Sequence, residues 1–492
     1  MRKFTKFKLA AVFAASLCVI PSAGGVSAQT ETPPAPSAPK TAAVPAVKEK
    51  KLANGLTVAV VERRSVPIVT VQLLVKNGAS SEDASKAGLA NLTASMLTKG
   101  TKTRTATQIA EEMEFLGGSI NNGAGWNNSV VSVTVTSDKL DQAMAILADV
   151  TRNPNFDEKE LGLLKSQTLD GLTYNLKQPG FLGNFVASKY SYNEHPAGGT
   201  PSSLASITRE DVAGFHSRYF APDFSVLIFA GDVTAAAANA LSEKYFGSWS
   251  KPKREAADGS DHGAMTKSSD DATLINRILV VDLPDSGQAS VTYARKIDGI
   301  GRSSKQYAPA SVLNSVLGGG YSSRLNQEIR IKRGLSYGAG SSFGWRSGGT
   351  NFSTRTQTKN ESAAEVAELV VGELNKLATG TISDVELVPR KSVLTGNFGR
   401  NLETTGGLAS ALGDLYSFGI PTSELNSYIT NVNNVKDAEI ESFAKANLNS
   451  GDIVIVGDYA KFKDDLAKRF PTVKVDVVKA ADLDLTKDDL RK

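Results

Sequence analysis

The side chains that could bind a metal or transfer protons are few in this sequence. There are three histidines, His195, His216 and His262, and one cysteine, Cys18. No two histidines have the i, i+4 spacing that puts both imidazoles on one helix face, and a catalytic zinc needs three protein ligands. We therefore expect no metal site of this chain's own. His195 is predicted to make a loop contact, His216 to be a half-exposed helix residue, and His262 to be solvated.

Arg330 and Tyr337 are the two side chains whose types suit carbonyl chemistry. They stand seven residues apart in GGGYSSRLNQEIRIKRGLSYGAGSS. Both donate hydrogen bonds and could stabilise the negative charge that develops on a carbonyl oxygen under attack. The same pattern also describes a surface arginine on an amphipathic helix and a tyrosine at the edge of the core after a turn at Gly334. On spacing alone, the second interpretation is favoured.

The elements that must position these residues occur twice in the same order. Each half runs through an apolar helix, a turn, an amphipathic helix, a glycine break and an alternating strand. The series begins at GLANLTASMLTKGT in the first half and at APASVLNSVLGGGYSS in the second. A longer helix starts later in each half, at Asp157 with Glu160 and at Ser383 with Glu386. The halves close alike, in SVLIFAGDV and in DIVIVGDY. The repetition predicts a duplicated α+β fold, two similar domains that each pack an antiparallel sheet against helices.

The N-terminus is typical of an exported protein. Residues 1–28 combine a basic start, an apolar run over Leu9–Ile20 and small residues before Ala28. This layout predicts a secretory signal peptide cleaved after about Ala28. We therefore expect a periplasmic or secreted protein, whose mature chain has no cysteine because Cys18 lies in the signal peptide.

Composition also sets the expected domain boundaries. Residues 29–47 form a Pro/Ala linker, and 251–271 form a polar linker rich in turn formers. They delimit an N-terminal domain over 48–250 and a C-terminal domain over 272–492.

Without the signal peptide, which holds four basic and no acidic residues, basic and acidic residues balance at 51 each. A near-neutral chain without a basic run argues against nucleic acid as partner, and no later apolar run has transmembrane length.

The ordered set of segments resembles the pitrilysin/insulinase family of zinc peptidases and its inactive relatives, such as the respiratory core proteins. The resemblance covers nearly all of the chain after the Pro/Ala linker. It is carried by LANGLTVAVVERRSVPIVTVQLLVKNGASSED, GLANLTASMLTKGT, FLGGSINNG, HPAGGTPSSLASITREDVAGFHSRYFAPDFSVLIFAGDV and VLGGGYSSRLNQEIRIKRGLSYGAGSSF. It implies two similar α+β domains, and in active members such a pair closes on another pair, or on a second chain, around a peptide.

The zinc site that the resemblance implies is degenerate. Active members carry H-x-x-E-H on the helix that here reads GLANLTASMLTKGT, and its three functional positions hold Asn91, Ala94 and Ser95. Asparagine is a weak zinc ligand, alanine has no proton acceptor, and serine is a poor ligand unless deprotonated. The family's third ligand, a glutamate, falls near Gly171. We therefore expect this chain to bind no cofactor, and zinc to be bound by a partner.

The resemblance gives other segments a role in holding substrate. In the family, an arginine and a tyrosine placed like Arg330 and Tyr337 hold the substrate carbonyls. The stretch Asn128–Thr136 would be either an edge strand that pairs with a peptide or an interior strand. The glycines at 318–320 are expected to form a turn or a mobile loop.

These features lead to one leading hypothesis and two alternatives. The chain would be the non-catalytic, substrate-holding subunit of an exported heteromeric zinc metallopeptidase, in a heterodimer with an H-x-x-E-H-bearing family member. It would be inactive alone. The first alternative is an inert scaffold or binding protein of the cell envelope, like the respiratory core proteins. A self-sufficient zinc peptidase is the least supported. No residue predicts a cleavage preference.

Overall fold

The computed structural model describes residues 44, 46–251, 275–487 and 489–492. The predicted signal peptide, most of the Pro/Ala linker, nearly all of the 251–271 linker and His262 therefore lie outside the described residues. Among the described helices, none is both long and apolar enough to cross a lipid bilayer.

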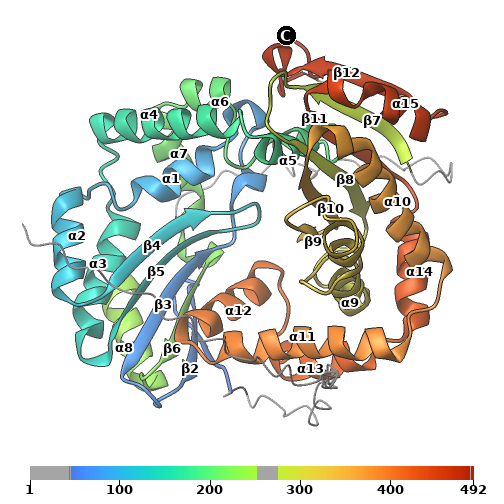
Figure 1. Ribbon diagram of the computed structural model, residues 1–492. Helices are drawn as coiled ribbons and strands as arrows, with labels where there is room; N and C mark the ends of the chain where they lie inside the picture. Colours follow the sequence, from blue (N-terminus) through green and yellow to red (C-terminus); the bar gives the residue numbers. More distant parts are fainter. Residues whose placement is uncertain (1–43, 45, 252–274, 488) are drawn as a thin grey trace, which may run out of the picture. The chain divides into compact units, whose positions relative to one another are not determined.

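Two six-stranded sheets form the framework of the fold (Figure 1). The first has the order β1-β2-β6-β3-β5-β4 and the second the order β12-β7-β11-β8-β10-β9. The strands of the first are β1 (Lys48–Lys51), β2 (Thr57–Glu62), β3 (Ile68–Val75), β4 (Ser119–Ala124), β5 (Ser129–Thr136) and β6 (Ser225–Gly231). Those of the second are β7 (Ile275–Asp282), β8 (Ala289–Asp298), β9 (Ala339–Trp345), β10 (Gly349–Thr358), β11 (Gly451–Gly457) and β12 (Val475–Lys479).

Helices connect the strands in both halves. The first half contains α1 (Leu89–Met96), α2 (Ala106–Phe115), α3 (Leu140–Arg152), α4 (Glu158–Asn175), α5 (Pro179–Tyr190), α6 (Pro201–Ser206), α7 (Arg209–Tyr219) and α8 (Ala235–Phe246). The second contains α9 (Tyr307–Leu317), the π-helix η5 (Asn326–Ile331), α10 (Ala363–Thr379), α11 (Asp384–Leu402), α12 (Thr405–Ser417), α13 (Glu424–Asn434), α14 (Asp437–Asn447) and α15 (Lys463–Arg469). Short 3-10 turns span Ala79–Ser81, Ala84–Lys86, Ser137–Lys139, Pro222–Phe224, Asn360–Ser362, Tyr459–Lys461 and Ala480–Asp482.

The predicted duplication is visible in the strand order, which is equivalent for β2-β6-β3-β5-β4 and β7-β11-β8-β10-β9. The sixth strand differs, because β1 opens its half and is antiparallel to β2, whereas β12 closes its half and is parallel to β7. In each half the last long strand returns after a series of helices and inserts between the first two long strands, β6 between β2 and β3, and β11 between β7 and β8. This return makes β6 parallel to β2 and β11 parallel to β7, while most other pairs are antiparallel. The predicted α+β class, with two sheets each covered by helices, is confirmed; the sheets are mixed rather than purely antiparallel.

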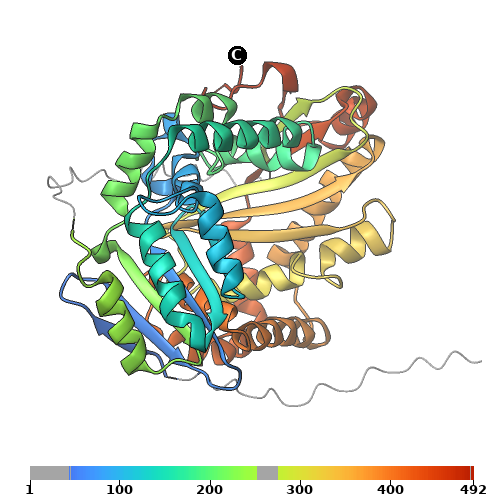
Figure 2. The ribbon, with the colours of Figure 1, turned by 90° about the vertical axis from the view of Figure 1, so that its left-hand side faces the viewer.

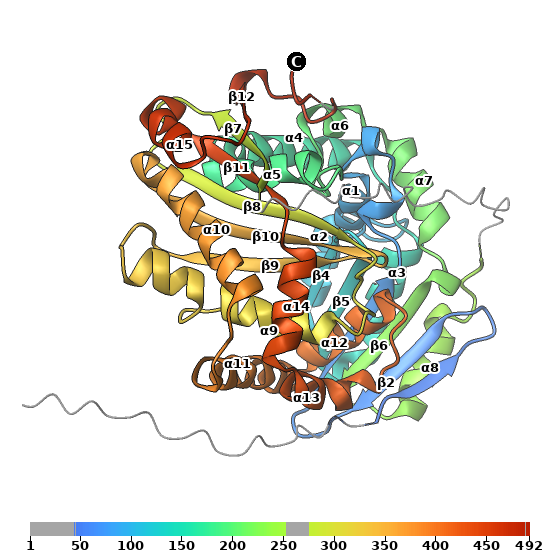
Figure 3. The ribbon, with the colours of Figure 1, turned by 90° about the vertical axis from the view of Figure 1, so that its right-hand side faces the viewer.

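Helices from each half cover the sheet of its own half. In the first half, α3 packs on β5 and α8 on β2, in the blue-to-green part of Figure 2. In the second half, α10 packs on β8 and against α14, and Figure 3 shows these two helices over the second sheet. The strands they cover are apolar on that side, with buried Val131, Val133 and Val291.

Two helices are exchanged between the halves. Helix α5 of the first half packs on β8 and β11, and helix α12 of the second half packs on β3 and β6 (Figure 1). Leu182 and Val186 of α5 share a core with Val454 of β11. Leu408 and Leu412 of α12 share another with Val226 and Ile228 of β6. Each sheet therefore has one face closed by the other half of the chain.

Glycines stand where two glutamine side chains of the sheets meet the exchanged helices. A Cβ atom on Gly413 of α12 would lie 2.5 Å from the Nε2 atom of Gln72 on β3. A Cβ atom on Gly180 of α5 would lie 2.3 Å from the Nε2 atom of Gln357 on β10. Real atoms do not approach to such distances, so a larger residue at either position would require the glutamine side chain opposite it to move.

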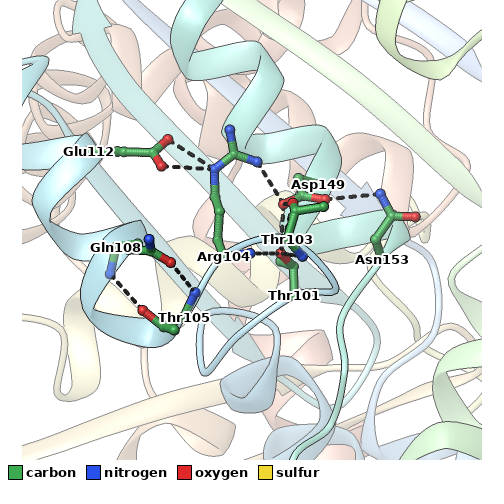
Figure 4. A network of polar contacts seen from close by, with 8 residues as sticks. All are labelled: Thr101, Thr103, Arg104, Thr105, Gln108, Glu112, Asp149 and Asn153. Carbon is green, nitrogen blue, oxygen red and sulfur yellow. Dashed lines mark hydrogen bonds and ion pairs between the residues drawn. The ribbon is translucent and has the colours of Figure 1, made fainter.

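A buried carboxylate, Asp149 of α3, fixes the loop between α1 and α2 (Figure 4). Its oxygens accept hydrogen bonds from the side chains of Thr101 (2.7 Å), Thr103 (3.1 Å), Arg104 (2.7 Å) and Asn153 (3.0 Å). Burial raises the pKa of Asp149, but these hydrogen bonds outweigh that effect and hold the pKa below its usual range. The loop that follows α1 is thereby tied to α3.

Replacing Asp149 by asparagine is expected to destabilise the fold by about 2 kcal/mol at neutral pH, because charge-assisted hydrogen bonds are lost in a buried place. Since the folded pKa is depressed, the advantage of wild type is present above about pH 4 and shrinks as the pH falls below that value. Urea unfolding at several pH values measures both effects. Asp141→Asn is the control, because the ion pair of Asp141 with Lys244 is exposed on both sides; an equal effect there would contradict this account.

Candidate functional site

The four positions of the degenerate zinc site lie on two neighbouring helices. Asn91 and Ser95 are half-buried and Ala94 is buried on α1, while Gly171 is exposed on α4, which packs against α1. No group of three histidine, cysteine, aspartate or glutamate side chains that could hold a metal occurs within the part of the chain that the structure describes. The residues at these positions therefore do not fit a zinc ion, because they supply an amide and a hydroxyl where two imidazoles are needed.

The N-terminus of α1 is held by a buried carboxylate that the sequence analysis missed. The side chain of Glu82 is fully buried. Its oxygens accept hydrogen bonds from the backbone N–H groups of Gly88 (2.7 Å) and Ala90 (2.6 Å). A negative charge is favourable at this end of a helix. The helix is thus firmly positioned although it carries no zinc ligands.

His195 makes a loop contact of the kind that the sequence predicts. Its Nε2 atom lies 3.1 Å from both the carbonyl oxygen of Ala79 and Oε1 of Glu82, and its ring packs on Trp126 at 5.0 Å between centroids. The imidazole joins the loop at 193–199 to the segment before α1. Its place beside Glu82 makes it part of the support of α1.

His216 is half-buried on α7, as expected, and is enclosed by aromatic rings. Its Nε2 atom lies 2.8 Å from the carbonyl oxygen of Thr151, and its ring packs against Phe156 and Phe220 at 5.2 and 4.9 Å. Burial lowers the pKa of His216 to about 4, against a smaller opposing effect of the Thr151 hydrogen bond. The neutral imidazole donates its Nε2–H to the carbonyl oxygen of Thr151 and packs against the two aromatic rings.

The depressed pKa of His216 predicts a loss of stability on mild acidification. The folded pKa, about 4, lies below the usual value of 6.5, so the unfolded chain binds the proton more tightly between these values. We expect this residue alone to remove about 2 kcal/mol of stability between pH 7 and pH 5. In His216→Gln, the unfolding free energy should depend less on pH over this range, and His262→Gln is the control. An unchanged pH profile in His216→Gln would refute the assignment.

Strand β4 is one of the two edge strands of the first sheet, and β1 is the other. Strand β5 lies between β3 and β4, so the interior interpretation of Asn128–Thr136 is correct and the edge-strand interpretation is wrong. Strand β5 pairs with β3 on one side and with β4 on the other, which leaves β4 outermost. Helix α1 packs beside β4, and the amide of Asn122 on β4 donates to the hydroxyl of Thr98 at 2.8 Å.

Arg330 and Tyr337 lie together at the π-helix η5. The N–H of Lys332 donates to the carbonyl of Gln327, five residues back, and Gly334, with a φ of +64°, ends the turn. This reversal brings the ring of Tyr337 to 4.7 Å from the Arg330 guanidinium carbon. Short π-helical segments are frequent at functional sites. The structure therefore brings together the pair that the resemblance singled out.

Tyr321 is a third member of this cluster that the sequence analysis missed. Its ring lies 4.9 Å from the guanidinium carbon of Arg330. It stands after the three glycines at 318–320, and Gly318 packs so closely on edge strand β9 that a Cβ atom would lie 2.2 Å from the backbone nitrogen of Ser341. Gly318 and Gly319 form a packed turn at this point, whereas Gly320 is exposed. The signal that the sequence offered was an aromatic residue directly after three consecutive glycines.

A duplicated α+β chain, with no zinc ligands on α1 of its first half and an arginine in contact with a tyrosine in its second half, has the features of inactive zinc-peptidase domains. Comparison with family profiles agrees: residues 57–172 match "Insulinase (Peptidase family M16)" and residues 206–393 match "Peptidase M16 inactive domain". The chain belongs to the insulinase (peptidase M16) family.

Relatives share this family over most of their length. An "Uncharacterized zinc protease" of Rickettsia felis is 28% identical over 389 residues, which cover 78% of this chain and 91% of that protein. A "Non-peptidase homolog YmxG" of Helicobacter pylori is 25% identical, with coverages of 82% and 91%. The crystal structure of a peptidase M16 inactive domain from Pseudomonas fluorescens is 27% identical, with a TM-score of 0.74 and coverages of 84% of this chain and 98% of that one.

Proposed function

We propose that this chain is the non-catalytic, substrate-holding subunit of a heteromeric zinc peptidase. A partner of the same family would carry the zinc ligands and the catalytic glutamate. The observation that carries the proposal is an asymmetry between two places in the chain. Arg330 and Tyr337 are in contact, and Tyr337 is 90% exposed and so available to a ligand. Asn91, Ala94 and Ser95, by contrast, offer no zinc site.

Two features of the fold support a role in holding peptides. Strand β4 leaves one edge of its sheet without a neighbouring strand, and an extended peptide can pair with such an edge through its backbone. Arg330 and Tyr337 supply side-chain donors suited to peptide carbonyl oxygens. Backbone pairing and carbonyl hydrogen bonds are both independent of side-chain identity, so the proposed ligand is an unstructured peptide of varied sequence.

The proposed place of action is outside the cytoplasm. The basic start, the apolar run and the small residues of 1–28 support export to the periplasm or the medium. The zinc-bearing partner is then expected to carry a signal peptide too.

Co-purification tests the proposed assembly. The tagged mature chain, expressed with an exported H-x-x-E-H-bearing family member of the same organism, is expected to elute with it as a heterodimer that holds zinc on the partner. An untagged, unrelated periplasmic protein is the control. If the two chains elute separately at micromolar concentrations, the proposal is wrong.

The inert scaffold is the second candidate, and it is favoured by the Helicobacter pylori relative, which is named a non-peptidase homologue. A scaffold would bind an envelope partner tightly and support no peptide hydrolysis in any combination. Hydrolysis by a reconstituted complex therefore separates the two candidates.

A further inference from the structure

A pocket opens beside Gly171, the position near which the family's third zinc ligand falls. It encloses about 430 Å³. Its walls come from α4, from α5 and from the loop at 196–199. Sites that bind small ligands typically enclose about 300–1,000 Å³. The space beside Gly171 is therefore large enough for a bulky side chain of a bound molecule.

Gly171 keeps this pocket open because it has no side chain. A Cβ atom built on Gly171 would have no neighbouring atom within 4 Å, so a side chain at this position would extend into free space. Gly171 lies inside α4, where glycine costs about 1 kcal/mol of stability relative to alanine. No close contact requires the glycine. The position that carries a zinc ligand in active members is thus free space in this chain.

The wall of the pocket is uncharged. Among the described residues that line it, none is acidic or basic. The rings of Phe181 and Phe185 stack at 5.7 Å between centroids, and Phe181 is 38% exposed. The hydroxyls of Thr168 and Ser188 donate to the carbonyl oxygens four residues earlier, at 2.7 and 3.1 Å. Uncharged walls with aromatic rings and hydroxyls that are already bonded favour an apolar ligand.

The pocket adjoins a groove that begins at Tyr337. This groove encloses about 370 Å³ and is lined by Tyr337 and by Asn184 of α5, and Asn184 also lines the pocket. The two spaces therefore meet at one side chain. A peptide held at Arg330 and Tyr337 can continue past Asn184 towards the pocket. Gln167 and Asn175 of the pocket add amide groups that can bond the backbone of such a peptide.

We infer that the pocket formed by Gly171, Phe181 and Phe185 holds one large apolar side chain of the bound peptide. The inference rests on the proposed function, because it takes a peptide as the ligand. Strand β4 and the pair of Arg330 and Tyr337 recognise the backbone, whereas the pocket adds a preference at one position. Phenylalanine suits this position, because aromatic rings attract one another in offset or edge-on contacts. In this chain the place of the lost zinc ligand binds substrate instead.

Three fluorescent peptides of one neutral, unstructured sequence test this preference. They differ at one central position, which holds phenylalanine, serine or lysine. Fluorescence anisotropy with the whole mature chain is expected to show about tenfold tighter binding of the phenylalanine peptide than of the other two, because its side chain is removed from water. Equal binding of all three would overturn the inference and leave peptide holding intact. No binding of any peptide would contradict the proposed function too.

Two glycines of α4 provide matched variants. Gly171→Leu fills the pocket and should reduce the preference for phenylalanine to less than about twofold. Gly162→Leu makes the same change at another exposed glycine with no atom within 4 Å of a built Cβ, but Gly162 does not line the pocket, so the preference should remain. Both variants should fold, because leucine is the better helix former. A preference that survives in Gly171→Leu, or that is lost equally in Gly162→Leu, would show that the pocket is wrongly assigned.

A second pair of variants separates the pocket from non-specific apolar binding. Phe181→Ala removes a ring of the pocket and should reduce the preference about threefold or more. Phe115→Ala removes a ring that is 88% exposed on α2, outside the pocket, and should leave the preference unchanged. If the three peptides bind equally and Gly171→Leu instead separates this chain from its partner during co-purification, the pocket holds a side chain of the partner, and the inference is overturned.

Discussion

Replacing Arg330 by alanine in a reconstituted complex is expected to lower the turnover of an unstructured peptide about 100- to 1000-fold. This is the range found when one preorganised donor to a developing oxyanion is removed. Arg330 suits this role because its guanidinium has no other polar partner among the described residues and adjoins Tyr337. Tyr337→Phe removes one hydroxyl donor and keeps the ring, so a loss of about tenfold or more is expected, mainly in kcat.

The matched control for this experiment is Arg333→Ala. Arg333 lies three residues further along the chain and carries the same charge, but its guanidinium is paired with Glu328. Its removal should change turnover less than about twofold, because partly exposed ion pairs contribute little. Unchanged turnover in Arg330→Ala and Tyr337→Phe would show that the pair has no part in peptide holding.

Replacing Leu412 by alanine is expected to destabilise the whole chain by about 2–5 kcal/mol. Leu412 is fully buried between α12 and the first sheet. Its truncation leaves a cavity and removes apolar contacts in an interface made by both halves. Because α12 belongs to the second half and the sheet to the first, both halves should unfold in one transition at a lower urea concentration.

Leu163→Ala provides the comparison on a helix surface. Leu163 is 55% exposed on α4, so the same chemical change should alter stability by less than about 0.5 kcal/mol. Two separate unfolding transitions in Leu412→Ala, with the first-half transition at its wild-type midpoint, would contradict the exchange of helices between the halves.

The duplication could be predicted because it depends on local signals. Asp157, for example, caps α4 through the backbone N–H groups of Lys159 and Glu160, and periodic apolar residues mark the strands. The exchange of α5 and α12 could not be predicted in this way. Periodicity shows that a helix such as α12 has an apolar face, but not which of two similar sheets it covers. The sequence likewise does not show that Gly413 of α12 lies opposite Gln72 of β3.

The candidate site was predicted from family resemblance more than from the types and spacing of its residues. Spacing alone favoured a surface role for Arg330, and the contact with Tyr337 arises from a π-helical turn that spacing does not encode. Tyr321 and Glu82 were missed because each acts through partners distant in sequence or across a turn. The position of β4 at the sheet edge likewise depends on pairing, which alternation within a strand does not define.

The most direct test of the central claim is peptide hydrolysis measured for this chain alone, for its zinc-bearing partner alone, and for an equimolar mixture. If this chain is the substrate-holding subunit, the chain alone has no turnover, the partner alone has little, and the mixture shows a large gain. Hydrolysis by the chain alone, with one zinc retained per molecule after dialysis against a chelator and lost on replacement of a histidine, would contradict this claim.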